Sequence, residues 1–229
     1  MESILQIIVK WGWNMDTVIE KVRGFVSQRD DRMTIGISGH GAAGKSTFAR
    51  QLAEKLGKEK INYIHTDPYI ISSNLRKHAA IDYTYEGKIH RYKMTACHPD
   101  AHFLPALERD IIMVRSGIDF YTIGTHYSES VLISSEKQIN IIEGMSVAYL
   151  DPALLDVGIY LFTDGETEFQ RRSVRDVNER GMDLTYLQHS HEERRIQYEL
   201  FMHPFSDQFD IIVKQVGATS YIEKASLNK

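Results

Sequence analysis

The chain has 229 residues, of which 42% are hydrophobic and 25% are charged, a composition typical of a globular protein. The length suits a single α/β domain over residues 1–229, because two compact domains would be cramped. The net charge of −4 argues against a basic surface for nucleic acid or for an anionic membrane, and the single cysteine excludes an internal disulfide.

Residues 1–32 are expected to form a helical extension ahead of the first strand. Apolar residues recur at helical spacing from Val18 to Val26 and predict an amphipathic helix over 15–28. The apolar run at the N-terminus follows an acidic residue and is short and interrupted, so we expect neither a signal peptide nor a membrane span. These features, together with the single cysteine, predict a cytoplasmic protein.

A glycine-rich segment lies between a β-rich run at 33–38 and a helical pattern at 47–56. It fits the phosphate-loop pattern G-x-x-x-x-G-K-[S/T]. In such a loop the backbone N–H groups surround phosphate oxygens, Lys45 reaches the β- and γ-phosphates, and the Ser46 hydroxyl binds Mg²⁺. The segment therefore predicts a site for ATP (or GTP) with Mg²⁺. Its nucleotide-binding residues are Gly39, His40, Gly41, Ala42, Ala43, Gly44, Lys45, Ser46 and Thr47.

The same glycines also fit the G-x-G-x-x-G pattern of dinucleotide-binding folds. In that interpretation Asp67, after the next apolar run, would take the place of the ribose-binding acid. Lys45 and Ser46 favour the phosphate loop, because a dinucleotide-binding turn has no use for a lysine and a hydroxyl directly after its third glycine. A glycine-rich turn without a ligand is the remaining alternative.

Apolar runs and helical patterns alternate through the rest of the chain. This order predicts a three-layer α/β fold with a mostly parallel sheet covered on both faces. Residues 118–134 differ, because they resemble two short extended pieces, and they predict a β-hairpin outside the main sheet. The predicted strands are 33–38, 60–65, 139–142, 158–162 and 210–213, and the further helices are 100–116, 165–180 and 183–202.

Two carboxylates follow predicted strands, at the sheet edge where ligands of parallel sheets gather. Asp67 comes after the second strand, where it can accept a proton from an attacking hydroxyl or hold water bound to the metal. Glu143 ends the third strand beside Gly144 and is expected to orient Mg²⁺ through water. The structural alternative for Asp67 is that its side chain caps the turn before Pro68. The alternative for Glu143 is an ordinary acid at a strand end.

Residues 168–180 contain an arginine-rich helical pattern. Arg172 and Arg175 lie on one face, with Arg171 beside them and Arg180 further along. Guanidinium groups that project together suit a lid that closes on phosphates during transfer. The alternative is a solvated face in which Arg172 and Arg180 pair with Asp176 at i,i+4 spacing.

Several motifs together resemble a known family. They are Asp67-Pro68-Tyr69, His98-Pro99-Asp100-Ala101, Tyr121 with His126, Glu143-Gly144, and Arg171-Arg172-Ser173-Val174-Arg175-Asp176 with Glu179-Arg180-Gly181. In order and spacing the chain resembles the uridine kinase and phosphoribulokinase group of P-loop kinases, and it is most similar to uridine–cytidine kinases.

The resemblance implies a kinase that transfers the γ-phosphate of ATP or GTP to the 5′-hydroxyl of uridine or cytidine. It implies that Asp67 is the base, that Lys45 and Arg175 are catalytic, and that Arg180 binds the nucleotide. It also implies metal contacts from Ser46 and Glu143. The implied substrate contacts are Tyr69, Tyr121, His126 and Arg172, of which Tyr121 and His126 read the pyrimidine.

The departures from the family pattern lie on the acceptor side. Cys97 replaces an Asp that holds ribose hydroxyls, Met182 replaces an Arg, and Thr122 and Ser128 replace two further polar residues. A kinase of another small alcohol, such as a sugar phosphate or a pantothenate-like acid, is therefore an alternative. A nucleotide-binding regulatory protein with an eroded acceptor site is another. The expected partner is a small molecule rather than nucleic acid or membrane. The sequence does not decide whether the protein forms a homo-oligomer.

Overall fold

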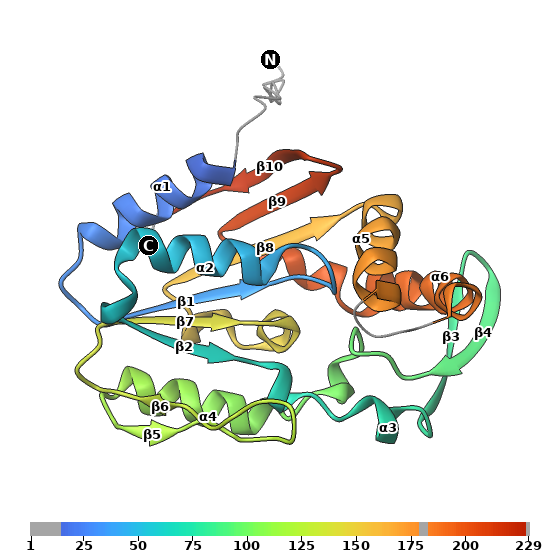
Figure 1. Ribbon diagram of the computed structural model, residues 1–229, viewed down its shortest axis with the longest axis horizontal. Helices are drawn as coiled ribbons and strands as arrows, with labels where there is room; N and C mark the ends of the chain where they lie inside the picture. The colour runs from blue at the N-terminus through green and yellow to red at the C-terminus, as the bar shows by residue number, and fades with distance from the viewer. Residues whose placement is uncertain (1–14, 179–182, 228–229) are drawn as a thin grey trace, which may run out of the picture.

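The computed structural model describes residues 15–178 and 183–227. Its centre is a six-stranded sheet in the order β10-β9-β8-β1-β7-β2, in which β10 (Thr219–Ala225) is antiparallel to its neighbour and the other strands are parallel (Figure 1). The five strands predicted from apolar runs are all present. They are β1 (Met33–Ser38), β2 (Ile61–His65), β7 (Ile139–Glu143), β8 (Val157–Thr163) and β9 (Ile211–Val216).

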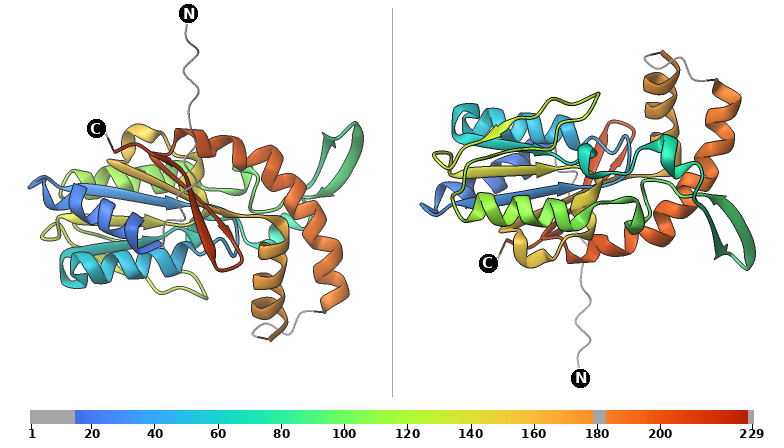
Figure 2. Two further views of the ribbon diagram at one scale, coloured as in Figure 1. Left: turned by 90° about the horizontal axis from the view of Figure 1, so that it is seen from above. Right: turned by 90° about the horizontal axis from the view of Figure 1, so that it is seen from below.

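Helices cover both faces of the sheet and make the three-layer fold that the sequence predicts. On one face, α1 (Met15–Ser27) and α2 (Lys45–Leu56) pack against alternate side chains of β1, β8 and β9 (Figure 2). On the other face, α4 (Leu104–Arg115) packs against the opposite side chains of β2, β7 and β8. Because successive side chains of a strand point to opposite faces, each buried strand serves both cores.

Two helices extend beyond the carboxyl edge of the sheet. They are α5 (Gly165–Asn178) and α6 (Leu184–Phe201), which run side by side in the two views of Figure 2. They match the predicted helices over 165–180 and 183–202 within the described residues. Among the helices of residues 15–178 and 183–227, none combines the length and apolar character that crossing a bilayer requires.

The structure corrects the predicted start of one helix. The helix expected over 100–116 begins at Leu104, because Pro99–Ala101 forms a separate short 3₁₀ turn. The hairpin expected within 118–134 is present as β5 (Phe120–Tyr121) and β6 (Leu132–Ile133), apart from the main sheet.

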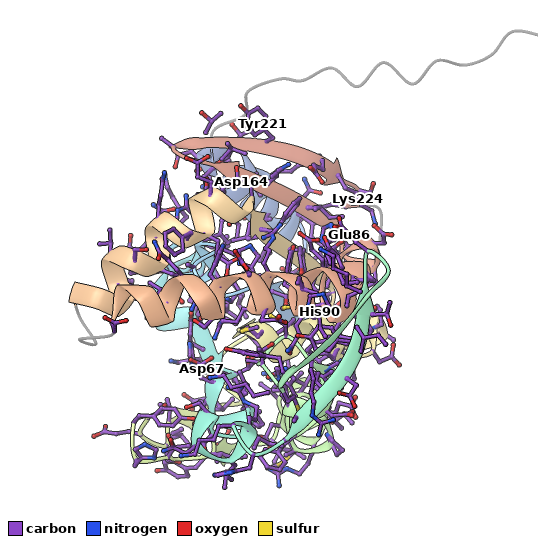
Figure 3. The ribbon with its side chains drawn as sticks, turned by 90° about the vertical axis from the view of Figure 1, so that its right-hand side faces the viewer. Asp67, Glu86, His90, Asp164, Tyr221 and Lys224 are labelled. Atoms are coloured by element: carbon purple, nitrogen blue, oxygen red, sulfur yellow. The ribbon has the colours of Figure 1, made fainter. Side chains whose placement is uncertain are left out.

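The sequence analysis missed a second hairpin, β3 (Ala80–Tyr85) and β4 (Lys88–Lys93). Glu86 and Gly87 join these strands with φ angles of 49° and 76°, the pair of positive values that a tight two-residue hairpin turn needs. The hairpin projects beside α6, and Figure 3 labels Glu86 and His90 on it.

Tyrosine hydroxyls join this hairpin to α6. The Tyr83 hydroxyl donates to Glu193 at 2.5 Å, and the Tyr85 hydroxyl donates to Glu199 at 2.6 Å. The amide of Gln197 also donates to the Tyr83 oxygen at 3.1 Å. Hydrogen bonds to carboxylates are stronger than neutral ones, so β3, β4 and α6 form one unit at the sheet edge.

Candidate active site

The glycine-rich segment curls back from the end of β1 to the start of α2. Gly39 has φ of 137°, and a Cβ atom there would lie 1.8 Å from the carbonyl oxygen of Leu161, so only glycine fits. Ala42 and Gly44 also have positive φ angles, of 66° and 88°, and α2 begins at Lys45. A loop of this shape in front of a helix N-terminus directs backbone N–H groups at an anion, as the phosphate-loop prediction requires.

The Lys45 side chain folds back against this loop. Its ammonium donates to the carbonyl oxygen of His40 at 2.9 Å, and the side chain is nearly buried. Burial lowers the pKa of Lys45, while the negative charges of Glu143 and Asp67 oppose that change. The ammonium therefore faces both carboxylates that the sequence analysis selected.

Glu143 is buried and gathers polar groups from α2 and β2. Its Oε2 accepts from the Ser46 hydroxyl at 3.2 Å and from the Tyr63 hydroxyl at 3.0 Å, and the Nε2 atom of His65 lies 3.3 Å away. Next to it, Gly144 has φ of 146°, and a Cβ atom there would lie 1.9 Å from Oγ1 of Thr66. The hydroxyl and carboxylate of Ser46 and Glu143 are the hard oxygen ligands that Mg²⁺ prefers, so this pair fits the predicted metal.

Tyr63 and His65 were missed in the sequence analysis. In the parallel pairing of β2 with β7, Tyr63 lies beside Ile141 and His65 beside Glu143, which brings both near the same carboxylate. Burial and the adjacent Glu143 raise the pKa of Tyr63, so its hydroxyl stays protonated and donates. The available signal was two rings with polar groups at alternate positions of this strand.

Asp67 lies at the other side of the cleft, after β2, and its side chain is 55% exposed. Its carboxylate is 4.0 Å from Nε2 of His65, and its backbone oxygen accepts from the Tyr127 hydroxyl at 3.3 Å. Among the described residues, the Asp67 carboxylate makes none of the turn-capping hydrogen bonds that the structural alternative requires. The carboxylate is thus available to a ligand in the cleft.

The arginines of α5 divide into two groups. Arg171 and Arg175 line the cleft, and Arg171 donates to the side-chain oxygen of Gln215 at 2.8 Å and to the Ala42 carbonyl at 3.3 Å. Arg172 is 2% exposed and lies 3.4 Å from His191, so it does not lie on the solvated face that the alternative describes. Arg180 lies outside the described residues.

A buried network joins the lid to the phosphate loop. Glu168 of α5 is 3% exposed, and its carboxylate lies 3.4 Å from Arg195 and 3.6 Å from Nδ1 of His40. The Nε2 atom of His40 accepts from the Thr163 amide at 2.9 Å, and burial lowers the pKa of His40 to about 4. His40 is therefore neutral at pH 7 and fixes the loop to the end of β8.

The acceptor residues implied by the resemblance are not all in the cleft. His126 lines it, but Tyr121 is 68% exposed and is not among the lining residues. Tyr69 is fully buried, and its hydroxyl donates to the buried Asp110. This geometry gives no support to a substrate contact by Tyr69 or Tyr121, because neither residue lines the cleft.

The cleft has a volume of about 960 Å³ and opens at the carboxyl edge of the parallel strands. Figure 3 looks onto this edge, with α5 and α6 in front and Asp67 labelled. The sequence analysis also missed two arginines that line the cleft, Arg76 on the short helix α3 (Ser73–Arg76) and Arg194 on α6. No local pattern marks them, because each reaches the cleft only through the tertiary fold.

The comparisons with known proteins agree with this geometry. The model of the phosphoribulokinase/uridine kinase family matches residues 34–221. A uridine kinase from Clostridium perfringens (strain SM101 / Type A) is 30% identical over 201 residues, which cover 80% of this chain and 87% of that protein. Uridine-cytidine kinase 2-B of Danio rerio is 28% identical over 188 residues, which cover 79% of this chain and 69% of that protein.

A solved structure shows the same fold at low identity. Phosphoribulokinase from Rhodobacter spheroides superposes with a TM-score of 0.57 at 16% identity, over 82% of this chain and 71% of that chain. The family match spans most of the sequence and includes the phosphate loop, Asp67, Glu143 and the lid arginines. This chain therefore belongs to the phosphoribulokinase/uridine kinase family, and it is an ATP-dependent kinase with a P-loop fold.

Proposed function

We propose that the protein transfers the γ-phosphate of ATP (or GTP) to a hydroxyl group of a small molecule, with Asp67 as the base. The observation that carries this proposal is that the phosphate loop, the Ser46–Glu143 pair and the Asp67 carboxylate all open into one cleft. Phosphoryl transfer needs a cradle for the donor phosphates and a group that accepts the proton of the attacking hydroxyl, and this cleft holds both.

Each residue has a role that follows from its position. Lys45, held by the loop carbonyl, stabilises negative charge on the phosphoryl group in transfer, and Arg175 adds a second positive charge from the lid. The exposed Asp67 orients the acceptor hydroxyl and removes its proton. Closure of α5 and α6 over the cleft would exclude water and so favour transfer over hydrolysis.

Ser46 and Glu143 are the residues that would hold Mg²⁺, as their oxygen donors and their 3.2 Å separation suggest. When bound, the ion neutralises charge on the donor phosphates. The Tyr63 hydroxyl would keep the Glu143 carboxylate in place for this task through its hydrogen bond at 3.0 Å.

The first acceptor to test is the 5′-hydroxyl of uridine or cytidine, as in pyrimidine salvage. Two observations support it: His126 lies in the cleft, and the relatives named above are uridine and uridine-cytidine kinases. The alternative, a phosphorylated or carboxylated alcohol, is favoured by Cys97, whose buried thiol supplies no negative charge for sugar hydroxyls. In either case the partner is a small molecule, and a cytoplasmic location stays a prediction.

The test of the proposed function is Asp67→Asn, with ADP release measured in a coupled assay over a panel of alcohols. Loss of a general base lowers turnover by about 100- to 10,000-fold. The ATP dissociation constant should change by less than twofold, because Asp67 lies on the acceptor side. The matched control is Asp82→Asn, on the exposed hairpin strand β3, which should keep full activity.

Two outcomes would contradict the proposal. If Asp67→Asn keeps turnover within a few-fold of the wild-type rate, Asp67 is not the base. If the wild-type protein binds ATP but no alcohol stimulates ADP release, the protein is a nucleotide-dependent regulator with an eroded acceptor site rather than a kinase of a small molecule.

A further inference from the structure

The charges that line the cleft are unbalanced. Its lining contains two carboxylates, Asp67 and Glu143, and five cationic side chains, although the whole chain carries a net charge of −4. The cations are Lys45, Arg76, Arg171, Arg175 and Arg194. Lys45, Arg171 and Arg175 lie where the phosphates of a nucleotide triphosphate would need positive charge. Arg76 and Arg194 are two further cations that the phosphoryl donor does not require.

Arg76 is fixed in place by the backbone. Its Nε donates to the carbonyl oxygen of Ile71 at 2.8 Å, and its Nη1 donates to that of Met94 at 3.1 Å. In the described part of the chain no carboxylate oxygen lies within 4.0 Å of this guanidinium. Burial lowers the pKa of Arg76, and the positive charge of Arg194 lowers it further. The guanidinium is therefore rigid, partly desolvated and repelled by its neighbour.

Arg194 approaches the same region from the lid. Its Nη2 lies 3.6 Å from the point where a Cβ atom on Gly41 would stand, so the side chain reaches the phosphate loop. It likewise has no carboxylate oxygen within 4.0 Å among the residues that the structure describes. Within residues 15–178 and 183–227, no hydrogen bond of its guanidinium to a described side chain or to the loop is present, which leaves its donors to a ligand.

Among the described residues no carboxylate lies within 4.0 Å of either guanidinium, although the buried Glu168 carboxylate interacts electrostatically with Arg194. The Cys97 thiol also interacts electrostatically with both guanidiniums. Cys97 is buried, and burial raises the pKa of its thiol to about 11, so the thiol is neutral at pH 7. Two guanidiniums that repel each other destabilise a partly buried site, and a bound anion would relieve that repulsion.

From this arrangement we infer that Arg76 and Arg194 bind an anionic group, a phosphate or a carboxylate, carried by the alcohol that accepts the phosphoryl group. The inference rests on the proposed function and names the chemical class of its acceptor. Arg76 belongs to the segment that begins at Asp67, so an anion held there places the rest of the acceptor near the base. Figure 1 shows α3 beyond β2, away from the start of α2, where the donor phosphates would lie.

The experiment compares matched acceptors that differ by one anionic group. D-Ribose is paired with D-ribose 5-phosphate and glycerol with D-glycerate, and uridine is included as a neutral nucleoside. We expect the wild-type protein to use a charged member with a kcat/KM at least tenfold above that of its neutral partner. The two pairs also decide whether the anion is a phosphate or a carboxylate.

The main variant is Arg194→Gln, and its Tm is compared with that of the wild type because Arg194 also interacts electrostatically with the buried Glu168. Loss of one charged hydrogen-bonding partner should raise KM for the anionic acceptor about 10- to 100-fold. The KM for ATP should change by less than threefold, and Arg194→Lys should restore part of the loss. Arg91→Gln, on the exposed strand β4, is the matched control and should resemble wild type.

A binding measurement separates failure of this inference from failure of the proposed function. The phosphate loop is first filled with a non-hydrolysable ATP analogue and Mg²⁺, and inorganic phosphate is then titrated by calorimetry. Wild-type protein should bind phosphate, and Arg194→Gln should bind it at least tenfold more weakly. Equal binding by both proteins, or none by wild type, overturns the inference even if an alcohol is phosphorylated.

Two kinetic outcomes also overturn it. One is a preference for uridine over every anionic acceptor that Arg194→Gln leaves unchanged, in which case the kinase assignment stands and the anionic class is wrong. The other is an Arg194→Gln variant in which only the KM for ATP rises, because the guanidinium would then bind the donor.

Discussion

Replacing Glu168 by Gln tests whether the buried network that joins the lid to the phosphate loop stabilises the protein. Burial alone would raise the pKa of Glu168, but His40, Arg194 and Arg195 lower it below its ordinary value, so the carboxylate is ionised at neutral pH. Removing one partner of a buried ion pair costs about 3–5 kcal/mol. Arg195 keeps a second carboxylate, Glu199 at 3.1 Å, so we expect the lower end, about 3 kcal/mol.

The assay is thermal unfolding at pH 7.5, followed by circular dichroism. In a protein of this size about 1 kcal/mol changes Tm by roughly 2–4 °C, so Glu168→Gln should lower Tm by about 6–12 °C. The control is Glu166→Gln, two residues away on the exposed side of α5, which should change Tm by less than about 2 °C. A decrease of Tm in Glu168→Gln that is no larger than in the control would refute the reasoning.

Two further predictions concern the site and the pH dependence of stability. Tyr63→Phe removes a hydrogen bond to Glu143 and should raise the Mg²⁺ concentration for half-maximal activity about two- to tenfold, with Tm unchanged; an unaltered Mg²⁺ titration contradicts this. Burial lowers the pKa of His102 from 6.5 to about 4, and the neutral ring forms hydrogen bonds with the Ser146 hydroxyl and the Ala96 carbonyl oxygen. Below pH 6.5 the unfolded chain therefore binds a proton that the native protein does not, so stability falls by up to about 3 kcal/mol as pH decreases to 4. In urea titrations the free energy of unfolding of His102→Gln should lack this pH-dependent component. Parallel pH profiles of the wild type and the variant would contradict the prediction.

The elements that carry strong local signals could be predicted from the sequence. The phosphate loop and the buried strands are specified by glycines, a lysine and continuous apolar runs, and the structure confirms them. The β3–β4 hairpin was missed because most of its side chains are exposed or half-exposed and its alternation is weak. The strand β10 lies at the sheet edge and has the same weak pattern.

The residues of the candidate site likewise divide into those with a strong local sequence signal and those without one. Asp67 and Glu143 could be predicted to face the phosphate loop, because parallel strands end at a common edge and each acid lies at or just after the end of one. Arg76 and Arg194 could not, since a helix of four residues and a position in the middle of α6 reach the cleft only after the whole chain has folded. Tyr69 is buried and its hydroxyl donates to Asp110, a tertiary contact that no local pattern indicates, and its role as a substrate contact stays a prediction.

The position of β1 inside the sheet sets the order in which the protein can acquire its nucleotide site during synthesis. Both neighbours of β1 come from about a hundred residues later, since Met33 pairs with Ile139 and Ile35 with Val157. A ribosome delivers the glycine-rich segment early, but the carbonyl of Leu161 that shapes it arrives only with β8. ATP therefore cannot support the early stages of folding, and the nascent chain must reach β8 before any ligand can hold it.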